Sequence, residues 1–386
     1  MLAAIQAASQ LIQETLVFPI LNLSLGQWLL WALVVTQLTI FSVTLWLHRS
    51  QAHRALDLHP GLAHAMRAWL WLTTGISTKQ WVAVHRKHHA RCETEQDPHS
   101  PKVLGLATVL FKGLSLYQKA RKDDSLVARY SHGAPNDWLE NQVYIRHSSA
   151  GLVLLGLANL VLLGFLPGLL MTGVQLLWIP LWAAGVINGL GHAKGYRNFE
   201  TADESRNLVP WAVWIGGEEL HNNHHAHPTS AKLSYRPWEV DIGWGAIVAL
   251  QALNLAKVRK AVYRPQVLQT AHSSLPQTLE CVTRHRLQIA SWYRALWNEA
   301  LRELNLPSQE QHRWQQKGPF SGQVCEDMPP VLQALTQRWA DLQKLWSEIR
   351  LSKEQLAEHL GQWLRSAEAA PVRGLPELAW KLQRIA

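Results

Sequence analysis

The sequence predicts an all-α integral membrane protein, in which transmembrane helices carry a cytosolic cap with a histidine-rich metal site, followed by a soluble helical extension. Two observations support this fold class. Long apolar stretches alternate with clusters of histidines, and the last third of the chain is polar with a helical pattern. The 386 residues are 48% hydrophobic, yet the mean hydropathy is only −0.08, so a membrane domain must be joined to a sizeable polar region.

Changes in composition divide the chain into three parts. Residues 1–24 form an N-terminal segment, of which 11–23 could form a short membrane-associated helix. Residues 25–260 form the membrane domain, and 261–386 form a cytosolic helical appendage. In the appendage we expect helices near 276–304, 353–369 and 375–385, a loop near 305–330, and an amphipathic helix where apolar residues recur every three or four positions from Val331 to Ile349.

Three apolar stretches approach the ~20 residues that a helix needs to cross a bilayer. We expect spans over about 25–47, 148–166 and 170–190. From Ser148 to Gly191 the chain has no Asp, Glu, Lys or Arg. Leu166-Pro167-Gly168 divides this stretch, which predicts a helical hairpin with its turn on the far side of the membrane.

A fourth apolar segment, residues 62–84, is predicted not to span. It contains Arg67 and Lys79, and a charge in mid-membrane costs roughly 2.5–3.5 kcal/mol. Histidines lie on both sides of it and can share one site only if the segment does not cross. Residues 48–147 carry 14 Lys and Arg against 8 Asp and Glu, which places the histidines on the cytoplasmic side. We therefore assign the net charge of +9 to membrane topology and expect no nucleic-acid partner.

The histidines form an H-x4-H pair, two H-x2-H-H triplets and one isolated position. In order they are His48 and His53; His85, His88 and His89; His192; and His221, His224 and His225. On a helix, residues four apart share a face, so the outer histidines of each triplet point together. The first pair is five apart and needs a helix end or a bend to reach one ion. A structural zinc takes four ligands, so nine histidines indicate two metals.

Imidazole suits iron, zinc, copper and nickel. At an active site that faces lipid, the reaction that most requires such a metal centre is the breaking of an unactivated C–H bond. Iron can activate O2 for that reaction. The chemistry would belong to the metal, and the protein would supply position, electronics and exclusion of water.

The clusters read HRSQAH, HRKHH and HNNHH, and they resemble the histidine boxes of the integral-membrane fatty acid desaturase family, closest to its bacterial Δ9 acyl-CoA (stearoyl-CoA-type) branch. The resemblance covers residues 25–260. It extends to Asn188-x3-His192, Gly217-Glu218-x2-His221 and Asp97-Pro98-His99. It implies a diiron enzyme that inserts a cis double bond, at Δ9, into a saturated acyl chain, with O2 as co-substrate and two external electrons.

The resemblance also implies roles for individual residues. All nine histidines would bind iron, and we expect no catalytic residue beyond this centre. Asn188 would approach a metal through water, Glu218 and Asp97 would orient imidazoles, and Trp81 would contact the substrate. The expected partners are a fatty acyl substrate, in the first place acyl-CoA, membrane lipid, and a separate electron donor (a ferredoxin, a cytochrome or a flavoprotein reductase). We expect the protein in the bacterial inner membrane, with its active site facing the cytoplasm.

One departure leaves the substrate open. Animal members carry Arg-Asp directly before the second box to hold coenzyme A, where this chain has Ala83 and Val84. An acyl-lipid desaturase is therefore an alternative. A histidine-box hydroxylase of alkanes or other lipids is another, although its second box would usually read H-x3-H-H. A metal transporter would place its ligands within the spans, and here they lie at span ends.

Overall fold

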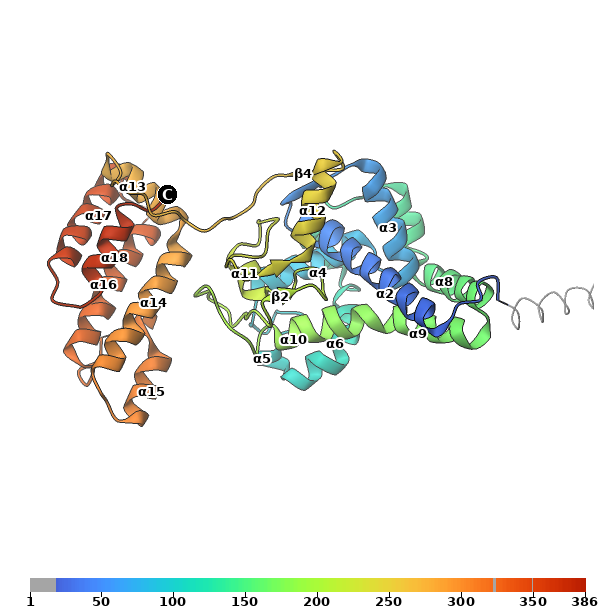
Figure 1. The fold of residues 1–386 in the computed structure, drawn as a ribbon, viewed down its shortest axis with the longest axis horizontal. Helices are drawn as coiled ribbons and strands as arrows, with labels where there is room; N and C mark the ends of the chain where they lie inside the picture. The colour runs from blue at the N-terminus through green and yellow to red at the C-terminus, as the bar shows by residue number, and fades with distance from the viewer. Residues whose placement is uncertain (1–18, 322–323, 349) are drawn as a thin grey trace, which may run out of the picture. The chain divides into compact units, whose positions relative to one another are not determined.

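The computed structural model describes residues 19–321, 324–348 and 350–386, and it is mostly helical (Figure 1). The chain divides into two compact units. The first comprises the described residues up to Arg197 together with Thr201–Val262, and the second comprises Asn198–Glu200 together with Tyr263–Ala386. Of the short helix considered over 11–23, residues 11–18 lie outside the described part of the chain, and residues 19–23 are not helical.

The helices of the first unit that are candidates to cross a membrane pack against one another (Figure 1). They are α2 (Leu25–Phe41), which continues as the π-helix η1 (Ser42–Ala52); the π-helix η2 (Leu139–Ile145) followed by α8 (Ser148–Leu163); and α9 (Phe165–Ile179), which continues through the π-helix η3 (Pro180–Ile187) into α10 (Asn188–Leu190). Leu25–Ala52 and Phe165–Leu190 are each long and apolar enough to cross a membrane, and η2 with α8, bent by 60°, would be a third crossing. Outward-facing Leu30, Val153 and Leu177 are more than half exposed, as lipid contact requires.

The turn of the helical hairpin lies earlier than predicted. The chain turns at Gly164, whose φ of 82° lies in the left-handed region that favours glycine. Pro167 and Gly168, which were expected to form the turn, lie in the first turn of α9. Proline is accepted there because the first helical N–H groups have no intrahelical partner. Gly168 is needed for packing, since a Cβ there would meet the backbone of Asn159 in α8.

The segment predicted not to span, residues 62–84, is divided between two helices. α3 (Pro60–Thr74) ends at Gly75, where φ is 64°, and α4 (Thr78–Arg91) begins after Ser77, whose side chain accepts a hydrogen bond from the N–H of Gln80. Arg67 is buried, and its guanidinium forms ion pairs with Asp137 at 2.8 Å and Glu140 at 3.0 Å. Glu140 also accepts a hydrogen bond from the backbone N–H of Lys79. Arg67 is therefore charge-paired, the ammonium group of Lys79 donates to Oδ1 of Asn136 at 2.9 Å, and these contacts fix the corner between α3 and α4.

Short elements complete the first unit around the histidines. They are β1 (Leu56–Leu58), α5 (Pro101–Leu104), α6 (Leu106–Ala120), α7 (Asp124–Tyr130), β2 (Trp211–Ala212), α11 (His221–Ala226), β3 (Val240–Asp241), α12 (Ile242–Ala252) and β4 (Ala256–Val258). β1 pairs antiparallel with β4, and β2 pairs parallel with β3. The first pair holds the end of the membrane domain against the segment between the first two boxes, and the second pair joins the two sides of the segment that carries the third box.

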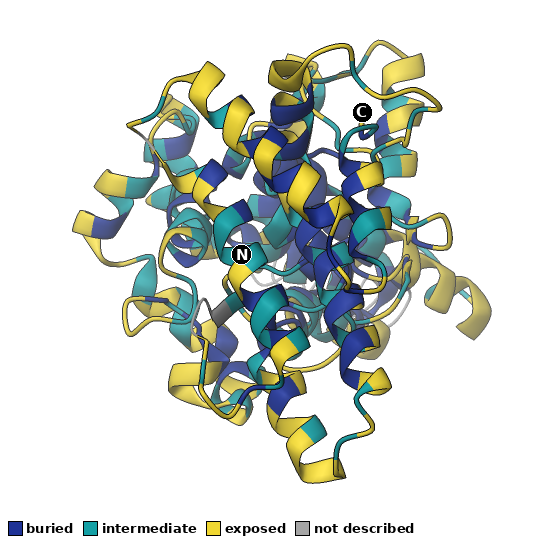
Figure 2. Ribbon diagram, turned by 90° about the vertical axis from the view of Figure 1, so that its left-hand side faces the viewer, coloured by how far each residue is buried: buried dark blue, intermediate teal, exposed yellow. Residues whose placement is uncertain are grey.

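The second unit is a helical bundle around a tryptophan-rich core. Its helices are α13 (Leu275–Arg284), α14 (Arg286–Glu303), α15 (Ser308–Lys317), η4 (Pro319–Ser321), α16 (Pro330–Ser347), α17 (Lys353–Glu368) and α18 (Leu375–Leu382). Figure 2 shows buried and exposed stripes along the helices, as amphipathic helices require. Two expectations are corrected: residues 276–304 divide into two helices at His285, and 305–330, expected to be a loop, contains α15, which buries Trp314. Ile349 lies outside the described residues.

Candidate metal centre

A π-helix explains the five-residue spacing of the first histidine pair. η1 has the wider turn in which each N–H bonds to the carbonyl five residues earlier, and the N–H of His53 bonds to the carbonyl of His48 at 3.1 Å. This winding places both imidazoles on one side, and their ring centroids are 4.8 Å apart. The H-x4-H spacing is therefore matched to a π-helix, where H-x3-H would suit an α-helix.

Five histidines converge from three elements to form a first group. They are His48, His53, His85, His89 and His224, and their potential ligand atoms all lie within 4.8 Å of one another. Within the group the Nε2 atom of His224 lies 3.0 Å from that of His48 and 2.9 Å from that of His89. The Nε2 atoms of His53 and His85 are 2.8 Å apart.

The other four histidines form a second group beside the first. His88, His192 and His225 place potential ligand atoms within 4.8 Å of one another, and the Nε2 atom of His221 lies 3.1 Å from that of His192. His89 and His225 connect the two groups, with stacked rings whose centroids are 4.4 Å apart. The structure thus gathers all nine sequence-predicted histidines into two adjacent groups.

The convergence of these nitrogens fits metal ions better than hydrogen bonds. An imidazole nitrogen carries one proton or one lone pair, so His224 Nε2 cannot form good hydrogen bonds to two neighbouring nitrogens at once. Ligands of a common ion, each at about 2.0–2.1 Å from it, lie at such separations. The Nε2 atoms of His88 and His225 are buried and have no hydrogen-bond partner within the described residues. The donor set therefore fits two metal ions.

Burial keeps these imidazoles in the form that binds metals. Desolvation lowers the pKa of His85, His89 and His224 well below the ordinary value, and the neighbouring histidines lower the pKa further. Neutral imidazole offers the lone pair that a metal needs.

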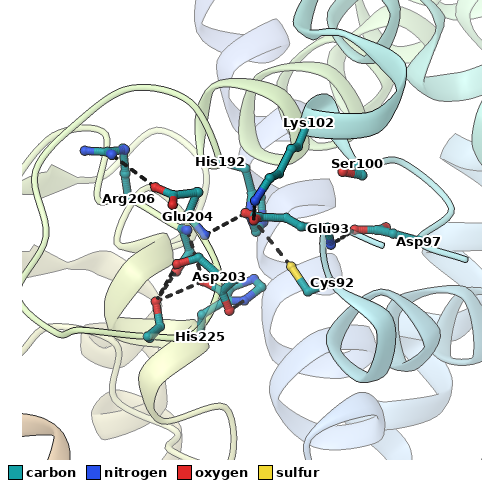
Figure 3. Close-up of polar contacts among 12 residues, drawn as sticks. Cys92, Glu93, Asp97, Ser100, Lys102, His192, Asp203, Glu204, Arg206 and His225 are labelled. Atoms are coloured by element: carbon teal, nitrogen blue, oxygen red, sulfur yellow. Dashed lines mark hydrogen bonds and ion pairs between the residues drawn. The ribbon is translucent and has the colours of Figure 1, made fainter. Parts of the chain in front are cut away.

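Four of the histidines have a carboxylate at the Nδ1 nitrogen. The pairs are His48 with Glu218 at 2.8 Å, His88 with Asp97 at 3.0 Å, His192 with Glu93 at 3.3 Å and His225 with Asp203 at 3.0 Å. Figure 3 shows Glu93 beside His192 and Asp203 beside His225. The carboxylates hydrogen-bonded to Nδ1 of His88, His192 and His225 fix the tautomer and direct Nε2 at the metal, and Glu218 lies at ion-pair distance from His48.

Two of these carboxylates, Glu93 and Asp203, were not among the predicted site residues. Glu93 follows the second box and also accepts a hydrogen bond from the N–H of Glu204. Asp203 belongs to an irregular loop and has no periodic pattern to mark it. Cys92 lies next to Glu93, and its Sγ is 3.9 Å from His192 Nδ1, within 4.8 Å of the potential ligand atoms of His88 and His225. Burial raises the pKa of the Cys92 thiol, which disfavours the thiolate that a metal would need.

A buried ion pair connects the first box to the third. Arg49, 1% exposed, forms a bidentate pair with Asp241 at 2.9 and 3.1 Å. It also donates to the carbonyls of Gly216 at 2.8 Å and Ala231 at 2.7 Å. The side chain next to His48 thus holds the loop that carries Glu218 and leads into α11.

A cavity of about 410 Å³ lies beside the histidines. His48, His85 and His221 form part of its wall, with Asn188 and Glu218, and most of the remaining wall is apolar. Trp81 also lines it, stacked on His85 with ring centroids 4.8 Å apart. Pockets of this size and character accommodate small apolar ligands, and a ligand in this cavity would lie beside the predicted metal ligands.

Comparison with known proteins adds an independent finding. The fatty acid desaturase family model matches residues 26–240. Among curated relatives, the sn-1 stearoyl-lipid 9-desaturase of Anabaena variabilis is 30% identical over 237 residues, covering 58% of this chain and 83% of the relative. The Delta-9 desaturase-like 4 protein of Arabidopsis thaliana is 29% identical over 234 residues, with 58% and 73% covered. The palmitoyl-monogalactosyldiacylglycerol delta-7 desaturase of Arabidopsis thaliana is 29% identical over 246 residues, with 61% and 62% covered.

Proposed function

The chain belongs to the fatty acid desaturase family, and we propose that it inserts a cis double bond, at Δ9, into a saturated acyl chain esterified in a membrane lipid. The observation that carries this proposal is the meeting of two histidine groups with one apolar cavity. Two irons held by the nine histidines would, when bound, supply the O2 activation needed to break unactivated C–H bonds. In the net reaction the acyl chain loses two hydrogen atoms. O2 combines with these two hydrogens, two external electrons and two protons to form two waters.

The residues of the chain have the roles of positioning and exclusion. Glu93, Asp97, Asp203 and Glu218 orient the imidazoles through Nδ1. Burial keeps the imidazoles neutral. The apolar wall excludes bulk water from the reacting carbons. Trp81 covers His85 and shapes the wall that an acyl chain would pass.

The identity of the lipid head is the point at which this proposal departs from acyl-CoA. Ala83 and Val84 pack against Leu126, and although Val84 lines the cavity, neither side chain has a polar group to bind a coenzyme A head group. Two of the relatives act on acyl chains in lipids, by their names. The sequence resemblance favoured acyl-CoA, and these observations support the acyl-lipid alternative.

Arg121 is the side chain that we propose to contact the lipid head. It lines the cavity, and its hydrogen bond to Gln80 is long, at 3.4 Å. No carboxylate pairs with it within the described residues. A half-buried guanidinium with spare donors suits a phosphate or ester oxygen. Lys119 and Lys122 are exposed and do not line the cavity, which makes them matched controls.

We further propose that electrons come from a separate redox protein and that the histidines face the cytoplasm. The first proposal follows the family, and the second follows the basic residues between the first box and α8.

Product analysis tests the proposed function. The chain would be produced with an electron donor in cells that lack their own desaturase, and the acyl chains of lipid and acyl-CoA pools would be analysed separately by gas chromatography with double-bond location. We expect monounsaturated chains to appear first in the lipid fraction. If monounsaturated chains appeared first in the acyl-CoA pool, acyl-CoA would be the substrate. If only hydroxylated chains appeared, the protein would be a hydroxylase.

Replacing Arg121 by Gln should raise KM more than it lowers kcat, whereas K119Q and K122Q should change neither.

A further inference from the structure

The acyl cavity follows one helix away from the histidines and ends at Gln175. The wall residues of this helix recur at helical spacing, namely Gln175, Leu176, Ile179, Pro180, Ala183, Ala184, Ile187 and Asn188. Asn188 shares the wall with His221 at the metal end. At a rise of 1.5 Å per residue, Gln175 lies roughly 20 Å along the helix from Asn188.

On this helix the lining of the cavity ends at Gln175, because the side chain one turn further on is packed away from it. Met171 is fully buried and belongs to an apolar cluster with Ala32 and Val35 of α2 and Leu163 of α8. The side chain of Gln175 is therefore the floor of the cavity on this helix, and Met171 is the layer beneath it.

This floor is polar, although it lies in the middle of an apolar hairpin. Gln175 and Asn159 are 4% and 5% exposed. The Nδ2 of Asn159 donates to Oε1 of Gln175 at 2.7 Å and to the hydroxyl of Thr172 at 3.0 Å. Because Oε1 is occupied, the amide NH2 is the part of Gln175 left to face the cavity. Polar groups at this depth are costly and are usually retained for function.

Two threonines that line the cavity do not act in the same way, although Ser148 and Ser149 also line it. Thr73 and Thr74 also line it, but their hydroxyls donate to the backbone carbonyls of Trp69 and Leu70. These bonds satisfy the hydroxyl hydrogens within α3. Unlike these threonines, Gln175 has its side-chain amide oriented by another side chain, Asn159.

We propose that Gln175, held by Asn159, is the residue that sets the length of acyl chain the enzyme accepts. This inference rests on the proposed function of the cavity. A methyl end pressed against the amide would leave its N–H groups without a partner, whereas a shorter chain leaves room for a water to bond them. Chains that end before Gln175 are therefore favoured over longer ones.

Three variants of the full-length, iron-loaded protein test this inference. Q175L keeps the size and removes the donors, Q175A opens the floor down to Met171, and T172V alters the same polar cluster without altering the lining. Each would be given phosphatidylglycerol vesicles with an equimolar series of saturated chains, and the ratio of long to short desaturated products would be measured. A change of one methylene unit in an apolar pocket is worth roughly 10-fold or more. We expect Q175L and Q175A to shift this ratio toward longer chains by about 10-fold, and T172V to leave it near the wild-type ratio.

A second readout separates this inference from the proposed function. The acyl composition of lipid retained by iron-free protein, purified from the same vesicles, should show the same shift without any turnover. If both readouts keep the wild-type chain length in Q175L and Q175A, or if T172V shifts them as much, Gln175 does not set the length. If the wild type yields no unsaturated product while the retained lipid shifts in the variants, the proposed reaction fails and the length-setting role stands.

Discussion

The carboxylate of Asp203 gives the most direct test of how the chain holds its metals. Its Oδ2 lies 3.0 Å from Nδ1 of His225, and its Oδ1 accepts hydrogen bonds from the hydroxyl of Thr201 at 2.9 Å and the N–H of Ser205 at 3.0 Å. Asp203→Asn keeps the size and one acceptor but loses the charge. The amide oxygen of Asn can still accept the two loop hydrogen bonds. The charged hydrogen bond to His225 is lost.

The magnitude follows from the one bond that is lost. A hydrogen bond to a charged group contributes about 1.5–3 kcal/mol, and the side chain of Asp203 is only 16% exposed, so solvent screens it little. At about 1.4 kcal/mol per factor of ten, the affinity for iron should fall roughly 10- to 100-fold. This is the range expected for residues that orient metal-binding histidines.

Iron retention against a competing chelator is the appropriate assay. Wild type, D203N and the neighbouring variant E204Q would be titrated under the same conditions. Glu204 is half exposed and forms ion pairs with Arg197 and Arg206, not with an imidazole, so E204Q should retain iron as the wild type does. Equal retention by D203N and wild type, or equal loss by both variants, would refute the role assigned to Asp203.

Three other outcomes are expected. Arg49→Met leaves Asp241 buried without its partner and should lower the free energy of unfolding by about 3–5 kcal/mol, measured by thermal unfolding in detergent; an unchanged midpoint would contradict the pairing. Gly113→Val should destabilise, because a Cβ at Gly113 would meet the backbone of Ala184, whereas Gly173→Ala, with nothing within 4 Å of its Cβ, should stay within about 1 kcal/mol of wild type. Removing iron with a chelator should abolish desaturation, and ferrous iron should restore it while zinc should not; recovery with zinc would exclude the proposed redox role.

Much of the site could be predicted from the sequence because histidines at fixed spacing are rare by chance. The three boxes and His192 do converge, and Asp97 and Glu218 do lie at Nδ1 nitrogens. Glu93 and Asp203 could not be predicted, since both act through contacts distant in sequence and lie outside any periodic pattern. The π-helix of η1 was foreseen only as a bend, because local propensity does not distinguish α from π winding.

The fold was predictable where composition alone decides and less so where single residues decide. The apolar runs marked the membrane helices. The hairpin turn was misplaced by a few residues, because Pro167 is as compatible with a first helical turn as with a loop. In the second unit, α15 forms where breakers predicted a loop, since Trp314 is buried in the core there. The cavity and its floor depend on packing between helices, which no local pattern encodes.

The iron content of the purified chain tests the central claim most directly. Protein produced in iron-replete cells and purified gently would be analysed for all first-row metals by mass spectrometry. Two groups of histidines, five and four in number, predict two irons per chain, and replacing His224 or His221 by Ala should lower that value. One iron per chain, or zinc in place of iron at full occupancy, would contradict the account.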